Sequence, residues 1–270
     1  MGDAATGRLT HVTTWDGPPE ATPAVLVHGT FSWGTLTFSG QRPLAASRRL
    51  LVPDRRGFGA SPGSYSDYAV DATDVISLVG EDDGAHLVGH SYGGTVAMLA
   101  AATRPDLVRS LTLIEPCAHQ VAADVPVVAQ AIEDGRRFME SARRGTAEEY
   151  IAAAYGERPR PSPAAWLTRA AETALGERPC WLASLATAPI LEASFPKLVI
   201  VGGWEVVPPG YLPGMAGLMQ AVCSRVAERI GARLVRVPGA AHEVQREQAG
   251  VVNSLLGSLW TAADRPASPR

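Results

Sequence analysis

A serine flanked by glycines is the first feature of this chain that points to chemistry. It lies in Gly89-His90-Ser91-Tyr92-Gly93, which follows an apolar segment and precedes an alanine-rich one. A serine at such a sharp junction between a strand and a helix projects its hydroxyl into a cleft. Glycines fit on either side because a Cβ there would collide with neighbouring backbone. The pattern indicates a nucleophile at Ser91 rather than a turn that only packs a helix on a strand.

The elements that must position this serine follow an alternating pattern. Short apolar segments alternate with longer segments of helical character, which predicts an α/β fold with a mostly parallel central sheet covered by helices. The predicted strands are Ala24–His28, Arg49–Pro53, Ala85–Gly89, Ser110–Glu115, Lys197–Gly202 and Arg233–Pro238, with Leu9–Trp15 as an edge strand. Three helices are predicted in this core. The first begins after Asp67, the second runs from Ser91 to about Thr103, and the third runs from about Gly250 to Trp260.

The segment 117–196 interrupts this rhythm. It carries no strong strand signal, and it reads as helical over Val127–Arg143, Thr146–Tyr155 and Ala164–Leu175. A connecting loop of this length is uncommon in a compact domain. We therefore predict a core made of residues 1–116 and 197–270, with a helical lid inserted at residues 117–196.

Four motifs occur in a characteristic order along the chain. They are His28-Gly29-Thr30, the run from Asp54 to Ser61, Gly89-His90-Ser91-Tyr92-Gly93-Gly94, and Gly239-Ala240-Ala241-His242. Their order and spacing resemble the α/β-hydrolase superfamily, in particular its lid-bearing branch of esterases, epoxide hydrolases and carbon–carbon hydrolases. The resemblance extends from His28 to His242, and it implies an α/β-hydrolase fold with a helical lid.

A serine hydroxyl is a weak nucleophile at neutral pH and needs a base. The chain has six histidines. The resemblance assigns the base to His242, which lies after the last predicted strand and before the final helix. His28 and His90 lie inside the other motifs, where packing or hydrogen-bonding roles are expected.

The third member of such a triad is a carboxylate that orients the imidazole. The resemblance places it after the strand Lys197–Gly202, where the turn ends in Glu205 instead of the usual aspartate. Some members of the superfamily carry the acid after the preceding strand, which here would be Glu115. Glu205 is the first candidate, Glu115 is the alternative, and Asp124 in the lid is a third.

Acyl transfer also needs two N–H donors directed at the developing oxyanion. One is expected from the backbone of Tyr92, directly after the nucleophile. The resemblance points to Thr30 for the other, with Phe31 as the next candidate. Arg55 and Arg56 can be interpreted as an anion clamp or as part of a tight structural turn, and the resemblance favours the structural role.

Composition excludes several other classes of protein. With 24 basic and 27 acidic residues, the net charge of −3 provides no basic field for nucleic acid. No stretch of sequence is long and apolar enough to predict a membrane span. No cluster has metal-ligand spacing and no cofactor motif is present, so neither a metal nor a cofactor is expected. The three widely spaced cysteines predict no disulfide framework and favour a cytoplasmic location.

The motifs together predict a serine hydrolase that cleaves an ester, thioester or related carbonyl compound through an acyl-enzyme on Ser91. A small hydrophobic substrate is expected, because a lid must bury an apolar face against the cleft. Acyl transfer, cyclisation, lyase chemistry or thioester release in natural-product biosynthesis is the alternative on the same site. A non-catalytic ligand binder is a third, less favoured hypothesis. A carrier protein and a second copy of the chain remain open as partners.

Overall fold

The computed structural model describes residues 10–63, 65–80, 84–142, 145–208, 211 and 214–265. Within these ranges, seven strands form one sheet in the order β1-β3-β2-β4-β5-β6-β7. β1 is antiparallel to β3, and every other neighbouring pair is parallel. The strands are β1 (Val12–Trp15), β2 (Ala24–Val27), β3 (Leu50–Pro53), β4 (Ala85–His90), β5 (Val108–Ile114), β6 (Lys197–Gly202) and β7 (Arg233–Val237). The predicted α/β fold class is confirmed, and each predicted strand is present; Leu9 lies outside the described residues.

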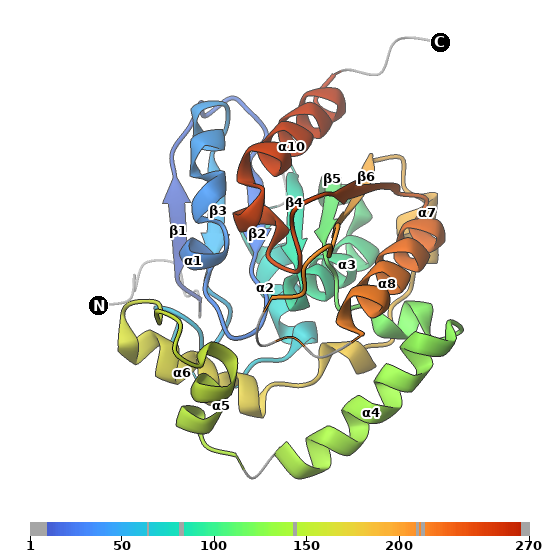
Figure 1. Cartoon of the computed structure of the whole chain (residues 1–270). Coiled ribbons are helices and arrows are strands. Elements are labelled where there is room, and N and C mark those ends of the chain that lie inside the picture. Colours follow the sequence, from blue (N-terminus) through green and yellow to red (C-terminus); the bar gives the residue numbers. More distant parts are fainter. Residues whose placement is uncertain are drawn as a thin grey trace.

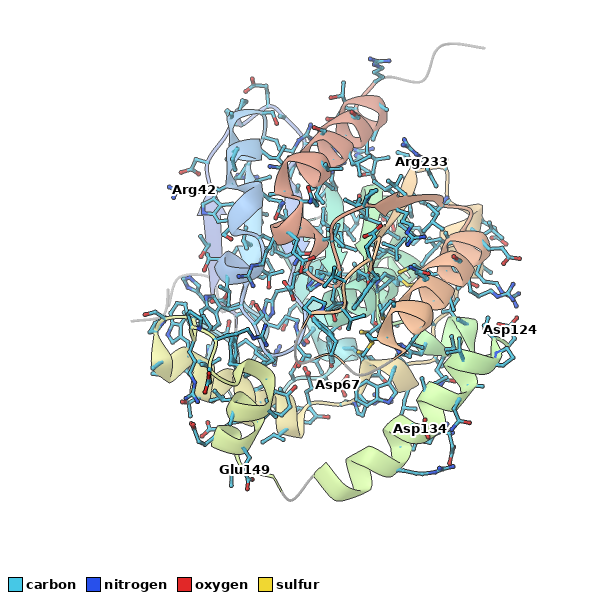
Figure 2. The ribbon with its side chains drawn as sticks, in the orientation of Figure 1. Arg42, Asp67, Asp124, Asp134, Glu149 and Arg233 are labelled. Carbon is cyan, nitrogen blue, oxygen red and sulfur yellow. The ribbon has the colours of Figure 1, made fainter. Side chains whose placement is uncertain are left out.

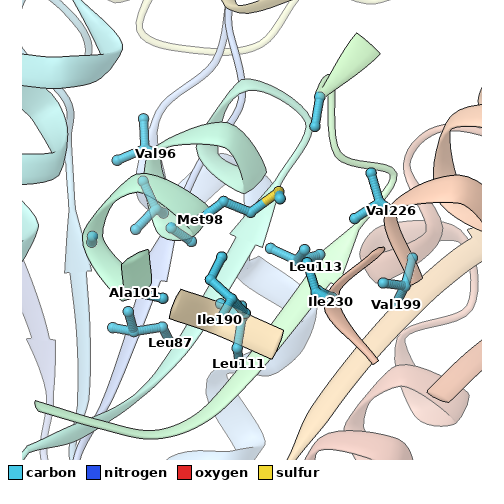
Figure 3. Packing of buried hydrophobic residues seen from close by; sticks show 14 of the residues in the cluster. Leu87, Val96, Met98, Ala101, Leu111, Leu113, Ile190, Val199, Val226 and Ile230 are labelled. Atoms are coloured by element: carbon cyan, nitrogen blue, oxygen red, sulfur yellow. The ribbon is translucent and has the colours of Figure 1, made fainter. Parts of the chain in front are cut away.

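Helices cover both faces of the sheet (Figure 1). One face packs against α2 (Tyr68–Val79), α3 (Tyr92–Thr103) and α8 (Met215–Ile230), and Figure 3 shows the close packing of its aliphatic side chains. The other face packs against α10 (Ala249–Ala263), whose Trp260 is fully buried. The sheet is therefore buried on both faces, which explains why its central strands are continuously apolar rather than alternating.

The segment 117–196 contains helices and no strand among its described residues. In Figure 1, the helices between residues 126 and 176 lie at the lower end of the molecule, and those between 147 and 176 pack against Phe31 in the loop that leaves β2. The helix at 188–192 lies instead beside α8 and contributes Ile190 to the core. The helices are η3 (His119–Ala122), α4 (Pro126–Ala142), α5 (Ala147–Tyr155), α6 (Ala164–Gly176), η4 (Cys180–Leu182) and α7 (Ala188–Glu192). Arg143, the predicted end of the first of them, lies outside the described residues. The helical character of the segment is as predicted, and its action as a lid stays a prediction.

α8 was not predicted from the sequence, although it contributes much of one core. Its buried residues are Met219, Val222, Cys223, Val226, Ala227 and Ile230. Their spacing of three and four residues is the standard signal of an amphipathic helix. The remaining short helices are α1 (Gly34–Thr37), η1 (Ser39–Ala46), η2 (Pro105–Leu107) and α9 (Val244–Glu247). Among the described residues, no helix combines the length and the apolar character needed to cross a bilayer.

Two glycines provide a test of the tight junction between β4 and α3. A Cβ at Gly93 would overlap the carbonyl oxygen of Val27, whereas a Cβ at Gly257 in α10 would meet open space. We expect Gly93→Ala to lower the free energy of unfolding by about 1–3 kcal/mol through overpacking. Gly257→Ala should raise it by about 0.5–1 kcal/mol by restricting the unfolded chain. Urea denaturation of both variants checks this; equal effects of the two would contradict the tight packing.

Candidate active site

Ser91 occupies a strained position between β4 and α3. Its φ of 54° and ψ of −119° are unusual for a residue with a side chain. The backbone is fixed on both sides, since the amide of Ser91 donates to Ile114 O at 3.0 Å and its carbonyl accepts from the amide of Cys117 at 3.1 Å. Only 5% of the residue is exposed. The conformation is thus imposed by the surrounding backbone, and it holds the hydroxyl in a defined direction.

His242 lies against Ser91. It follows β7 in the turn before α9, as the sequence predicted for its place in the chain. Its Nε2 is 3.0 Å from Ser91 Oγ, which is hydrogen-bond distance. Its backbone carbonyl is 2.9 Å from Nε2 of His90, so His90 supports this turn rather than the nucleophile. The structure therefore brings together the two side chains on which the predicted chemistry depends.

Glu115 is the carboxylate that approaches His242. It follows β5 directly, has a φ of 46° and is completely buried. Its Oε2 is 3.4 Å from His242 Nδ1, which is long for a hydrogen bond. The contact nevertheless involves the ring nitrogen that does not face Ser91. Glu115 Oε1 accepts hydrogen bonds from the amide of Gly202 at 2.7 Å and from Trp204 Nε1 at 3.0 Å. These bonds compensate for burying the charge and fix the carboxylate beside the imidazole.

Glu205, the first candidate from the sequence, lies elsewhere. Its side chain is exposed and accepts a hydrogen bond from the amide of Gly239 at 3.1 Å. Trp204 adopts a φ of 55°, so the turn directs the indole toward Glu115 and sends the next side chain outward. The third candidate, Asp124, pairs with Arg225 at 3.1 Å at the periphery of the molecule (Figure 2). The structure thus places the alternative, Glu115, against His242, and not Glu205.

The loop after β2 passes directly beside Ser91. A Cβ on Gly29 would lie 3.0 Å from Ser91 Cβ, which brings the following residue, Thr30, to the nucleophile's side. Tyr92 is the first residue of α3, so its amide has no acceptor within that helix. The helix N-terminus also favours negative charge. The two backbone amides predicted as oxyanion donors therefore belong to segments that adjoin Ser91.

A buried ion-pair network joins this loop to the inserted segment, and the sequence analysis missed it. Arg55 pairs with Asp71 at 2.9 Å and with Glu177 at 3.2 Å, and all three side chains are nearly inaccessible to solvent. Glu177 also accepts a hydrogen bond from the hydroxyl of Thr30. Burial raises the pKa of Glu177 to about 7, against the opposing charge of Arg55. The network fits the structural role that the resemblance favoured for Arg55.

A thiol beside the nucleophile was also not predicted, because an isolated cysteine carries no local signal. Cys117 Sγ is 3.4 Å from Ser91 Oγ. Among the residues that the structure describes, no three histidine, cysteine or acidic side chains form a group able to hold a metal ion.

The surroundings of His242 stabilise its protonated form. Burial lowers the pKa of this imidazole, but the hydrogen bond that its Nδ1–H donates to Glu115 and the negative charge of that carboxylate outweigh burial and raise the pKa to about 9. An imidazole held in this way is suited to accept a proton and to keep it while negative charge develops nearby.

Comparison with known proteins places this geometry in a family. Residues 24–255 match the alpha/beta hydrolase family. The chain belongs to this family. The match includes Ser91, Glu115 and His242 and spans the sheet from β2 onward, so the family's fold accounts for most of the molecule.

Individual relatives differ in how much of this α/β hydrolase they resemble. The sn-1-specific diacylglycerol lipase ABHD11 of Danio rerio is 34% identical over 109 residues, which are 37% of this chain and 33% of the relative. The first curated relatives are matched over only 28–33% of their own length. A thermophilic esterase from Thermogutta terrifontis is 28% identical with a TM-score of 0.67, covering 97% of each chain. Carboxylesterase CesB of Bacillus subtilis is 20% identical with a TM-score of 0.65, covering 94% of this chain and 88% of its own, and shows the fold alone.

The contact between Glu115 and His242 can be tested without a substrate. Glu115→Gln removes the negative charge next to the imidazole, so the pKa of His242 should fall from about 9 to below about 8. Glu205→Gln is the matched control, because it makes the same chemical change on an exposed side chain, and it should leave this pKa in place. Histidine NMR titration measures both; an equal fall in the two variants would contradict the contact.

Proposed function

We propose that the protein is a serine hydrolase of small hydrophobic esters. The observation that carries this proposal is the continuous contact from Ser91 Oγ to His242 Nε2 at 3.0 Å and from His242 Nδ1 to Glu115 Oε2 at 3.4 Å. This is the arrangement of a nucleophile, a base and an orienting carboxylate. It supports Glu115 as the acid, because Glu205 makes its hydrogen bond with Gly239 instead.

In the proposed reaction, Ser91 Oγ attacks the carbonyl carbon of the ester while His242 Nε2 accepts the hydroxyl proton. Glu115 stabilises the imidazolium that forms. His242 then protonates the leaving alcohol, and the acyl group stays on Ser91. A water molecule, deprotonated by the same imidazole, attacks the acyl-enzyme and releases the acid.

The negative oxygen of each tetrahedral intermediate needs fixed donors. We assign this role to the backbone amides of Tyr92 and Thr30. Support comes from the position of Tyr92 at the start of α3 and from the close approach of Gly29 to Ser91. The hydroxyl of Thr30 is engaged by Glu177, so the amide of Thr30 rather than its side chain is assigned this role.

Aromatic side chains around these donors favour an apolar acyl or alcohol group. Phe31, next to Thr30, packs edge-to-face against two tyrosines of α5. Its ring centroid lies 4.8 Å from that of Tyr150 and 5.7 Å from that of Tyr155. Next to the base, the ring centroid of Tyr211 lies 5.8 Å from that of His242. Apolar walls with a few polar groups are typical of small-molecule sites. The esterase from Thermogutta terrifontis, similar over nearly its whole length, supports the same assignment.

Removal of the nucleophile or the base provides the first test. Ser91→Ala and His242→Ala should each lower kcat for p-nitrophenyl acetate by at least about 10³-fold, and the double variant should be hardly worse, because triad members act as a unit. A fluorophosphonate probe should label the wild type but not Ser91→Ala. Ser254→Ala, on the exposed side of α10, is the control and should retain full activity.

Two results would contradict this mechanism. Labelling of Ser91→Ala at the wild-type rate would place the nucleophile elsewhere, and losses that add in the double variant would separate the roles of Ser91 and His242. Product analysis with an added alcohol or thiol acceptor distinguishes hydrolysis from acyl transfer, because water and the acceptor resolve the acyl-enzyme to different products.

The acid can be identified from a pH profile. The base form of His242 is the active one, so kcat/KM in the wild type should rise with pH up to about 9. Glu115→Gln should move this rise to lower pH and reduce the plateau by about 10²- to 10⁴-fold. Glu205→Gln should stay within about twofold of the wild type at every pH. The reverse ranking of the two variants would return the acid role to Glu205.

A further inference from the structure

The peptide unit between Gly29 and Thr30 is held from its carbonyl side. Gly29 O accepts a hydrogen bond from Arg55 Nη2 at 3.1 Å and lies 2.7 Å from His28 Nδ1. The backbone amide of Arg55 donates to His28 Nε2 at 2.9 Å, so in the neutral ring the proton is on Nδ1 and is donated to Gly29 O. Burial keeps the ring neutral, because it lowers the pKa of His28 well below its ordinary value. Two donors thus converge on one carbonyl oxygen, which has two lone pairs to accept them.

This carbonyl belongs to the same peptide unit as the amide of Thr30. Because that unit is planar and trans, fixing the direction of its C=O also fixes the direction of its N–H on the opposite side. Donors at the carbonyl oxygen polarise the peptide unit and strengthen its N–H as a donor. The side chain of Thr30 is held as well, because its hydroxyl donates to Glu177. The amide assigned to the oxyanion is therefore fixed through its own peptide unit and through its side chain.

Arg55 also contacts the residue that provides the other assigned amide. Its guanidinium carbon lies 3.9 Å from the centroid of the Tyr92 ring, which is a cation–π distance. The hydroxyl at the far end of that ring donates to the carbonyl of Arg178 at 3.1 Å. One guanidinium therefore contacts both segments whose backbone amides are assigned to the oxyanion.

The terminal nitrogens of Arg55 are occupied by protein groups. Nη1 donates to Ser66 Oγ at 2.7 Å and to Asp71 Oδ2 at 2.9 Å. Nη2 donates to Glu177 Oε2 at 3.2 Å in addition to Gly29 O. Arg55 is only 3% exposed, and Glu177 reaches it from the inserted segment, between α6 and η4. Arg55 is thus placed to act through the peptide unit and not on a substrate.

We propose that Arg55, held in place by Glu177 of the inserted segment, is a positioning residue that keeps the amides of Thr30 and Tyr92 directed at the oxyanion. This inference rests on the proposed function, because it concerns the intermediates formed at Ser91. Its effect falls on the transition state and not on the binding of the substrate, since the negative oxygen forms only after attack. The inserted segment thus takes part in turnover through Glu177.

The rate at which a fluorophosphonate labels Ser91 tests this role, because phosphonylation uses the oxyanion donors without requiring a complete turnover. Arg55→Met should lower the maximal labelling rate by about 10- to 100-fold, which is less than the roughly 10²- to 10³-fold cost of losing a whole donor. The probe concentration that gives half of this rate should stay within about twofold of the wild type. For p-nitrophenyl acetate, kcat/KM should fall by the same factor as the labelling rate.

Arg56→Met is the matched control, because it makes the same change at the next residue. The guanidinium of Arg56 forms two hydrogen bonds of 2.7 Å with Asp74 instead of contacting the oxyanion segments. This variant should keep the labelling rate and kcat/KM of the wild type. Circular dichroism and urea denaturation establish that each variant is folded under the assay conditions.

The hydroxyl of Thr30 provides a second test, which serves also if Arg55→Met folds poorly. Thr30→Val removes the hydroxyl that donates to Glu177 but keeps the backbone amide, so the maximal labelling rate should fall by about 3- to 10-fold. Thr30→Ser restores the hydroxyl and should return the rate to within about twofold of the wild type. Equal rates in the two variants would overturn the part assigned to Glu177.

Three results with the arginine variants would overturn the proposal. They are an unchanged labelling rate in folded Arg55→Met, an equal loss in Arg56→Met, and a loss that appears only as weaker binding of the probe. A wild type that is labelled at Ser91 but hydrolyses no ester would instead refute the proposed function, and the labelling rates would still decide the role of Arg55.

Discussion

A carboxylate buried without solvent contact is the constraint on which the site depends. Isolated in a protein interior, the charge of Glu115 would be strongly unfavourable. Here the amide of Gly202 and the indole of Trp204 donate to one oxygen, and His242 faces the other. The strained turn after β6 makes this contact possible, because the positive φ of Trp204 brings its indole N–H to the carboxylate. The same charge raises the pKa of His242, so the acid, the turn and the base form one unit.

The sequence predicts those members of this unit whose positions depend on neighbouring residues in the chain. Ser91 was predictable because its glycines and its strand-to-helix context lie within a few residues. His242 was predictable from its motif and its place before α9. The choice between Glu115 and Glu205 was not, because it depends on the backbone angle at Trp204 and on a contact between the ends of β5 and β6. Each is a glutamate in the turn that follows a strand of the central sheet, so residue type and local spacing do not tell the two apart.

The same distinction separates the fold from the contacts around the site. The central strands were predictable because burial on both faces makes each of them a continuous apolar run. α8 was not predicted, although the spacing of its buried residues is regular. The network of Arg55, Glu177 and Thr30 and the contact between Cys117 and Ser91 had no signal in the sequence, because each joins residues far apart in the chain. The nucleophile and the base are thus marked by local motifs, whereas the contacts that surround them are formed over long distances in the chain.

The contact between Glu115 and His242 also opposes the neutral form of the imidazole, which is the form that acts as a base. His242 has a raised pKa of about 9 in the folded protein, so the stability it contributes is present below its ordinary pKa of 6.5 and is lost as pH rises through 9. Glu177 has a raised pKa of about 7, so the folded state binds its proton more tightly, and stability falls as pH rises from 4.5 to 7. Yet proton abstraction from Ser91 requires the neutral imidazole, which increases over the same upper range. The charge arrangement that orients the base therefore also weakens the fold in the pH range where that base is free.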